Sequence, residues 1–210
     1  MTAPSRERAR RALDIVLAAT GLVVLAPAAA ALAALILLRI GPPVLFRQTR
    51  TGRGGVEFSI LKFRTMRPPD RPGQPDGERE TRIGRLLRSA SLDELPQLVN
   101  ILRGDMSIVG PRPTVPEQVR HYTARQWRRL DVRPGLTGWA QVCGRNSLSW
   151  PDRIELDLWY IEHRTWWLDL RIVARTAACL LRPRGVTGAG GVNPGFPAAD
   201  PPVKEAADAP

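Results

Sequence analysis

Two adjacent carboxylates, Asp93 and Glu94, have the residue types and the setting that chemistry needs. Ser91 precedes them as a predicted helix N-cap, and Glu94 stands where a capping box places its acidic partner. The dipole and free N–H groups of a helix stabilise a carboxylate in its first turn as an anion. An ionised carboxylate at neutral pH suits a nucleophile. The structural alternative, in which both residues only decorate a helix start, stays open at this point.

The stretch from Ser91 to Gly104 is predicted to form this helix, and Gly104 ends it. Pro96 lacks an N–H donor, so the true cap can be displaced by a residue. One face carries apolar residues at helical spacing and is expected to pack inward: Leu92, Leu95, Val99 and Leu102. Another face carries polar residues: Asp93, Gln97 and Asn100.

Arginines lie on both sides of this stretch. Three recur along one side of a short helix predicted over residues 81–89: Arg82, Arg85 and Arg88. Arg112 follows the stretch between two prolines, which fix its backbone. Because guanidinium groups bind phosphates bidentately, the arginines indicate a cationic wall facing Asp93. A solvated outer face is the alternative.

Two further places carry cations that can bind anions. Lys62 and Arg64 share one face of a strand predicted within residues 44–66. A Gly-Arg-Asn turn at residues 144–146 offers backbone donors and the guanidinium of Arg145. The alternatives are a solvated strand edge for the first pair and an ordinary loop for the turn.

The net charge of +11 over 210 residues implies an anionic partner. Nucleic acid, a phosphorylated substrate and an anionic membrane surface all satisfy this condition. Two cysteines, Cys143 and Cys179, are too few for a disulfide framework. Together with His121 and His163 they form no zinc-binding pattern.

The segment from Ile15 to Leu38 carries no charge and is long enough to cross a bilayer as one helix. Pro27 lies near its midpoint, where proline kinks a helix. Arginines flank both ends, so the positive-inside rule selects no orientation. A spanning helix and a re-entrant helix, which enters and leaves by the same face, both remain open from the residues alone.

The remaining pattern predicts a helix-rich α/β domain. Strands are expected within residues 44–66 and 136–142, and helices over 116–130, 150–160 and 166–181. Tryptophans beside arginines in the last two helices suit either a membrane interface or a bulky core. The predicted division is a membrane-associated segment over residues 1–43, a compact cytosolic domain over 44–182 and a disordered tail over 183–210, rich in Pro, Gly and Ala.

Several motifs together make the chain resemble the bacterial sugar transferases of the monotopic phosphoglycosyl transferase superfamily. They are the Lys-Phe-Arg-Thr-Met run at 62–66, the Asp-Glu-Leu-Pro-Gln run at 93–97, Gly-Pro-Arg-Pro at 110–113, the run from Arg133 to Val142, and Gly-Arg-Asn at 144–146. The similarity extends from Arg8 to Leu181.

This resemblance implies a re-entrant, proline-broken membrane helix and an enzyme that moves a sugar-1-phosphate from a UDP-sugar to polyprenol phosphate and releases UMP. Asp93 is then the nucleophile, Glu94 binds Mg²⁺ and Pro27 breaks the helix. The residues expected to bind the substrate and its phosphates are Lys62, Arg64, Arg88, Arg112, Gln141 and Arg145. The enzyme is expected at the cytoplasmic membrane with its catalytic domain in the cytoplasm, without nucleic acid, as a homodimer or beside downstream glycosyltransferases.

Two departures from the family pattern stand out. Ala26 replaces the serine that usually precedes the helix-breaking proline, and Cys143 occupies a position where a polar residue is common.

Two competing functions are a membrane-anchored basic module that binds nucleic acid or anionic lipid, and an inactive scaffold in a glycan-assembly complex. The intact Asp93–Glu94 pair argues against the scaffold.

Overall fold

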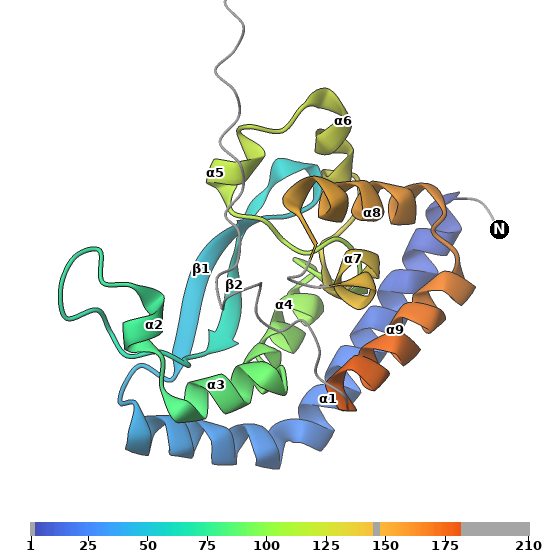
Figure 1. Cartoon of the computed structure of the whole chain (residues 1–210). Coiled ribbons are helices and arrows are strands. Elements are labelled where there is room, and N and C mark those ends of the chain that lie inside the picture. The colour runs from blue at the N-terminus through green and yellow to red at the C-terminus, as the bar shows by residue number, and fades with distance from the viewer. Residues whose placement is uncertain (1–2, 145–147, 182–210) are drawn as a thin grey trace, which may run out of the picture.

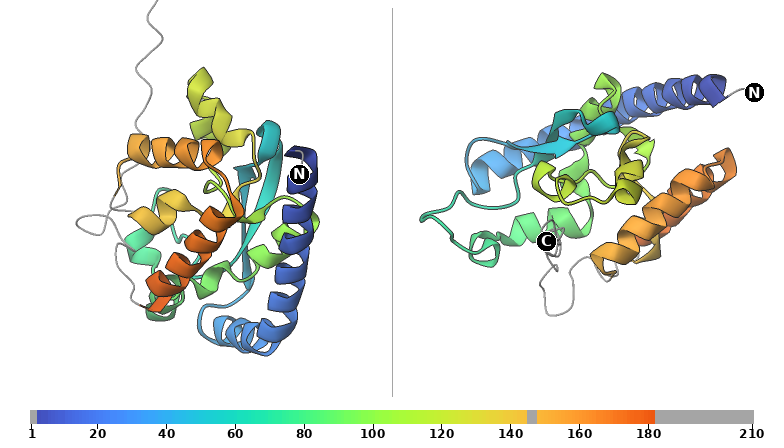
Figure 2. Two further views of the ribbon diagram at one scale, coloured as in Figure 1. Left: turned by 90° about the vertical axis from the view of Figure 1, so that its right-hand side faces the viewer. Right: turned by 90° about the horizontal axis from the view of Figure 1, so that it is seen from above.

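A computed structural model describes residues 3–144 and 148–181, and Figure 1 shows its helix-rich α/β architecture. The predicted tail over 183–210 and Arg145 lie outside these residues. One long helix, α1 (Ala3–Arg39), contains the uncharged segment and continues through Pro27. It changes direction part-way along, so that two arms meet at an elbow (Figures 1 and 2). Proline explains such a bend because it removes one backbone hydrogen bond.

Both arms of α1 pack against the rest of the chain. In the N-terminal arm, Arg11 donates to the carbonyl of Ile101 and Asp14 accepts from the amide of Ile108 at 2.9 Å. In the C-terminal arm, Ile36 is buried in a cluster with Phe63 and Leu87. Apolar side chains in the turn of α1 that precedes Pro27, which we call the elbow, are exposed instead. Val23 and Val24 are 76% and 68% exposed.

The predicted strands over 44–66 form an antiparallel hairpin of β1 (Leu45–Thr51) and β2 (Glu57–Phe63), joined through a short 3₁₀ turn, η1 (Arg53–Gly55). A one-turn helix, α2 (Asp76–Arg79), then leads to α3 (Arg82–Ser89), whose N-cap Thr81 accepts from the amide of Gly84 at 2.9 Å. The helix predicted over residues 81–89 is therefore confirmed.

The single helix predicted from Ser91 is wrong at its start. Ser91 adopts a left-handed conformation, with φ of 56°, and its side chain makes no capping bond. A 3₁₀ turn, η2 (Leu92–Glu94), comes first, and helix α4 (Gln97–Arg103) begins after Pro96. Gly104 ends α4 with φ of 97°, as predicted. The displacement follows from Pro96, which is tolerated where a helix begins and not in its interior.

The buried face of α4 also differs from the prediction. Leu98 and Ile101 are buried together with the polar Gln97 and Asn100. Asn100 accepts a hydrogen bond from the amide of Leu61 at 3.0 Å and donates to the carbonyl of Ser59 at 2.8 Å. Its amide is buried because it satisfies backbone groups of β2, which apolar periodicity does not reveal.

The predicted helix over 116–130 is also wrong, because this region forms three short pieces: α5 (Pro116–Val119), α6 (Ala124–Trp127) and η3 (Arg128–Leu130). Thr123 makes a capping box with Gln126 and so starts a new helix inside the predicted one. The strand predicted over 136–142 is only β4 (Gly135–Thr137), parallel to β3 (Ser107–Val109), and α7 (Trp139–Cys143) follows it.

Two predicted C-terminal helices are confirmed as α8 (Trp150–Glu162) and α9 (Trp166–Leu181). Tyr160 of α8 and Ile172 of α9 are fully buried in one cluster with Val109 of β3. Trp167 is 75% exposed. The N-terminal arm of α1 is tied to this pair of helices because Arg10 contacts Asp169 at 3.0 Å.

Candidate active site

The site lies where η2 meets the end of β2. Asp93 is buried, with 7% of its surface exposed, and the Glu94 side chain is 15% exposed. The left-handed Ser91 turns the chain out of α3 immediately before them. This turn, together with Pro96 at the start of α4, places both carboxylates before α4 rather than inside it.

Two cations hold Glu94. Lys62 of β2 donates to its Oε1 at 2.7 Å, and Arg112 donates to the same oxygen at 2.9 Å. The Nζ of Lys62 also lies 4.0 Å from Oδ2 of Asp93. The structure thus brings together four of the predicted site residues: Lys62, Asp93, Glu94 and Arg112.

The two carboxyl groups have pKa values that move in opposite directions. Burial raises the pKa of Asp93, Lys62 offsets part of this rise, and the neighbouring charge of Glu94 adds to it. Burial also acts to raise the pKa of Glu94, but Arg112 and Lys62 outweigh burial and lower it to about 2. Paired carboxyl groups with separated pKa values are a frequent property of active sites.

Arg50 and Arg153 belong to the same electrostatic environment, although sequence reasoning did not select them. Burial, together with the charge of Arg112, lowers the pKa of Arg50 to about 10. Burial and then Arg112 also lower the pKa of Arg153. In the described part of the chain, the Arg50 Nε and the Arg153 Nη2 are buried without a hydrogen-bond partner. The alternation of β1 was a usable signal, because Arg50 lies on the same face of the hairpin as Lys62.

Other predicted site residues have different partners. Arg64 donates to the carbonyl of Pro42 at 2.8 Å. Arg88 forms an ion pair with Glu80, which also pairs with Arg85 at 3.0 Å. Two of the three arginines in the predicted cationic wall on α3, Arg85 and Arg88, are therefore paired with Glu80. The side-chain amide of Gln141 donates to the carbonyl of Leu136 at 3.1 Å, and its Oε1 is buried without a partner among the described residues.

An apolar cavity of about 190 Å³ is lined in part by Leu95 and Pro96, the two residues that follow the carboxylates in the chain. Pro96 and its neighbours on α4 form one side of it, and the elbow of α1 forms another. The residues that line it are Leu22, Leu25, Ala29, Leu45, Phe63, Leu95, Pro96 and Leu98. The segment that carries the two carboxylates thus continues directly into the wall of an apolar cavity, whose opposite side is formed by α1.

The carboxylate set is compatible with Mg²⁺, although no group of three or more acidic, histidine or cysteine ligands occurs within residues 3–144 and 148–181. Mg²⁺ is commonly held by one or two carboxylates together with substrate phosphates and water. Both hydrogen bonds from Lys62 and Arg112 go to the same Glu94 oxygen, Oε1. The other carboxylate oxygen of Glu94 is therefore the atom that is best placed to coordinate a cation.

The sequence model of the family described as "Bacterial sugar transferase" matches residues 5–183. The chain belongs to the bacterial sugar transferase family. The resemblance drawn from the motifs is thereby confirmed, and the chain is a transferase.

Curated relatives agree with this family. An "uncharacterized sugar transferase EpsL" of Bacillus subtilis is 47% identical over 156 residues, which cover 73% of this chain and 77% of the relative. A UDP-glucose:undecaprenyl-phosphate glucose-1-phosphate transferase of Caulobacter vibrioides is 46% identical over 185 residues, 82% of this chain and 69% of the relative. A UDP-N-acetylgalactosamine-undecaprenyl-phosphate N-acetylgalactosaminephosphotransferase of Aeromonas hydrophila is 39% identical over 82% of this chain and 43% of its own length. Because these relatives are named as transferases, they do not favour a basic binding module or an inactive scaffold as the function of this chain.

Proposed function

We propose that this sugar transferase moves a sugar-1-phosphate from a UDP-sugar to undecaprenyl phosphate, through a covalent intermediate on Asp93, and releases UMP. This reaction would begin the synthesis of an exopolysaccharide, a capsule or another glycoconjugate. The observation that carries the proposal is the Asp93–Glu94 pair, which contacts Lys62 and Arg112 and is followed in the chain by residues that line an apolar cavity. Relatives named for reactions with UDP-glucose and UDP-N-acetylgalactosamine support this substrate class.

The proposed first step forms one bond and breaks one. A carboxylate oxygen of Asp93 attacks the β-phosphorus of the donor, and the bond from this phosphorus to the bridging oxygen breaks. The electron pair leaves with UMP, and the sugar phosphate remains on Asp93 as a mixed anhydride. In the second step an oxygen of polyprenol phosphate attacks the same phosphorus and restores the carboxylate. UMP leaves before polyprenol phosphate reacts with the covalent intermediate, and this order predicts ping-pong kinetics.

Charge decides whether this step can occur, because a carboxylate and a diphosphate repel each other. Lys62 and Arg112 already oppose the charges of Asp93 and Glu94, so additional cations are needed for the donor. Arg50 and Arg153 can provide them, since each has a buried nitrogen without a partner among the described residues. We therefore include Arg50 and Arg153 with Lys62 and Arg112 in the diphosphate-binding set. Positioning and charge neutralisation are the main contributions of proteins to phosphoryl transfer.

The raised pKa of Asp93 fits a nucleophile whose charge is withheld from solvent. A desolvated carboxylate is more reactive than a hydrated one once it is ionised, and Lys62 at 4.0 Å stabilises its ionised form. Glu94 has a pKa of about 2 and stays ionised throughout the working range. The two neighbouring carboxyl groups thus have different properties: Asp93 is the reactive one, and Glu94 is the one that always carries a charge.

Glu94 is the proposed Mg²⁺-binding residue. The ion would neutralise charge on the diphosphate and on the leaving phosphate. Chelation with EDTA should abolish UMP release, and added Mg²⁺ should restore it. Unchanged turnover in EDTA would remove the metal from the proposal without affecting the role of Asp93.

The arrangement of α1 supports a re-entrant helix. Its N-terminal arm binds the domain through Arg11 and Asp14, and its C-terminal arm through Ile36. A straight helix of 37 residues would place its two ends about 55 Å apart. Because both arms contact the same domain, the exposed apolar elbow is the part that fits the bilayer interior. The cavity at the elbow is then the proposed entrance for the first isoprene units of the acceptor.

We further propose that α9 lies at the membrane interface, because Trp166, Trp167 and Leu170 leave large apolar surfaces exposed. The enzyme would then sit at the cytoplasmic membrane, with its domain on the cytoplasmic side where UDP-sugars occur. A homodimer and contacts with later glycosyltransferases are compatible additions and have no role in the chemistry above.

The decisive experiment measures UMP release by membrane fractions supplied with undecaprenyl phosphate and a series of UDP-sugars. The wild-type enzyme should release UMP with at least one donor, and Asp93→Asn should release none. A donor labelled in the sugar should leave a covalent adduct on Asp93 when the acceptor is omitted. Turnover by Asp93→Asn, or labelling at another residue, would contradict the covalent mechanism.

A further inference from the structure

The segment that carries Arg112 is held unusually firmly along its backbone. Arg112 is an exposed residue between two buried prolines, Pro111 and Pro113. Neither proline has an N–H group, so the segment depends on its carbonyl groups for anchorage. The four successive carbonyls of residues 111–114 are each bound by a different donor. In chain order, these donors are the Gly135 amide, the Arg129 guanidinium, the Arg50 guanidinium and the Thr51 amide.

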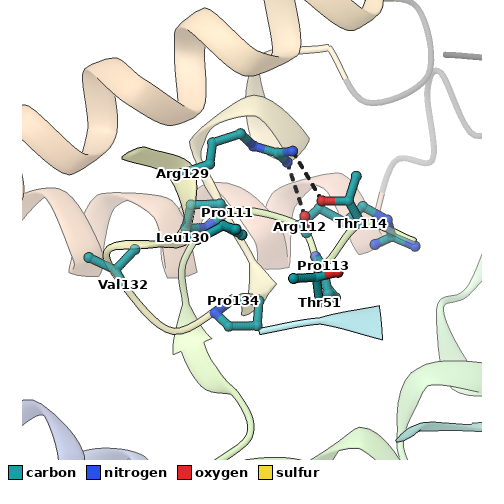
Figure 3. A pocket seen from close by; sticks show the side chains of 9 residues that line it. All are labelled: Thr51, Pro111, Arg112, Pro113, Thr114, Arg129, Leu130, Val132 and Pro134. Carbon is teal, nitrogen blue, oxygen red and sulfur yellow. Dashed lines mark hydrogen bonds between the residues drawn. The ribbon is translucent and has the colours of Figure 1, made fainter. Parts of the chain in front are cut away.

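Arg129 is the donor for Arg112 itself. Its Nη2 donates to the carbonyl oxygen of Arg112 at 3.0 Å, and its Nη1 donates to the hydroxyl of Thr114 at 3.3 Å (Figure 3). Figure 3 shows the guanidinium reaching across to these two residues from the opposite wall of a small cavity. One side chain thus holds the segment on both sides of Pro113.

A buried partner fixes this guanidinium in turn. Asp157 of α8 accepts from the Nε of Arg129 at 2.9 Å, and its Oδ2 lies 2.7 Å from Nη2. The side chains are only 3% and 2% exposed. The hydroxyl of Tyr122 accepts from Nη1, so all three nitrogens of Arg129 are occupied.

The energetics of such a pair point away from a role in stability alone. Removing two charges from water costs as much as their attraction returns, and apolar residues of similar size serve stability equally well. What an apolar pair cannot do is donate to the Arg112 carbonyl. The rigid, planar fork of an arginine fixes the direction of its donors. The pair therefore supplies the anchor at the Arg112 carbonyl itself, and so helps to set the direction from which the Arg112 side chain reaches Glu94.

We propose that Arg129, held by Asp157, is a positioning residue that sets the Arg112 guanidinium against Glu94 and the donor diphosphate. This inference rests on the proposed function. Neither residue touches the reacting atoms, and their effect on turnover passes through Arg112.

A double-mutant cycle tests this dependence. Arg129→Lys keeps the charge but loses the fork, and it should lower kcat/KM for UMP release from UDP-glucose, or from the best donor of the screen, by about 10- to 100-fold. In an Arg112→Ala background the same change should lower kcat/KM less than about 2-fold, because the residue through which it acts is gone. The matched control is Arg128→Lys at the neighbouring position, which alters only a half-exposed ion pair with Glu162 and should be neutral in both backgrounds.

A second variant separates positioning from folding, should Arg129→Lys be unstable. The apolar exchange Arg129→Met with Asp157→Leu removes both buried charges together and should keep the melting temperature close to that of the wild-type enzyme. Its kcat/KM should nevertheless fall by at least the factor seen for Arg129→Lys. Full activity in this variant, or equal losses with and without Arg112, would overturn the inference. A wild-type enzyme that releases no UMP from any donor would instead overturn the proposed function.

Discussion

Replacing Glu94 with glutamine should lower the melting temperature at neutral pH, whereas Asp93→Asn, one residue away, should raise it. Both changes keep the side-chain shape and remove one negative charge. They differ because Lys62 and Arg112 stabilise the ionised form of Glu94, while burial disfavours the ionised form of Asp93. The expected difference in sign therefore tests the electrostatic description of the site directly.

The size of the Glu94 effect follows from its pKa. A change from 4.5 to about 2 corresponds to about 3 kcal/mol in favour of the folded, ionised enzyme. Arg112 is 50% exposed and regains water when its partner is lost, so we expect a measured loss of about 1–3 kcal/mol. For a chain of this size that is roughly 3–10 °C in melting temperature.

The pH dependence has an equally defined sign. The stabilisation from Glu94 is complete above pH 4.5 and is lost as the pH falls towards 2, so wild type and Glu94→Gln should converge in that range. The destabilisation from Asp93 is absent below its ordinary pKa of 3.8 and grows as the pH rises through the raised value. The advantage of Asp93→Asn should therefore disappear in acid.

Thermal melts of detergent-purified protein, followed by tryptophan fluorescence at pH 7.5, at pH 4 and near pH 2.5, provide the measurement. Asp93→Asn also has to lose UMP release, because a more stable fold without activity is the expected signature of a buried catalytic carboxylate. If both amide variants shift the melting temperature in the same direction, the opposed electrostatic settings of Asp93 and Glu94 are wrong.

Three further predictions concern the donor, the acceptor and the membrane. Arg50→Gln should raise the KM for the UDP-sugar by about 10- to 100-fold, the value of a hydrogen bond to a charged group, whereas Arg47→Gln on the other face of β1 should not; equal effects would exclude Arg50 from the diphosphate site. Ala29→Trp fills the apolar cavity and should raise the KM for undecaprenyl phosphate several-fold without changing the first burst of UMP, with the exposed Ala28→Trp as control; a slower burst would place the defect at the donor. Cysteines introduced at the two flanks of α1, with the native cysteines replaced, should both react with a membrane-impermeant reagent from the cytoplasmic side only, and opposite-side labelling would mean a spanning helix.

The sequence was most informative where the hydrophobic periodicity of an element agrees with the residues that begin and end it. The strands within 44–66, the end of α4 at Gly104 and the two C-terminal helices all have regular patterns or a clear terminating residue, and all were predicted. Asp93, Glu94, Lys62 and Arg112 were selected as site residues from their types, and the structure brings these four together.

One miss has a local cause, and the others depend on tertiary contacts. Pro96 excludes Asp93 and Glu94 from the helix proper, so the expected capping box does not form. Asn100 is buried because of a tertiary hydrogen bond to β2 that no local pattern encodes. The pairing of Arg88 with Glu80 likewise depends on how α3 meets the preceding loop, and the Arg129–Asp157 pair joins residues that periodicity treats as unrelated.

The proposed re-entrant arrangement of α1 also has a consequence for the side of the membrane on which the product is released. In the proposed re-entrant arrangement, α1 would displace lipid from a single leaflet, and the cavity lined by Leu22, Leu25 and Ala29 would lie within that leaflet. A sugar attached to its carrier at this depth therefore starts on the side where the nucleotide donor was used. Carrying the head group to the far side of the bilayer must be the task of a separate flipping reaction, since nothing in this geometry moves a charged diphosphate across hydrocarbon.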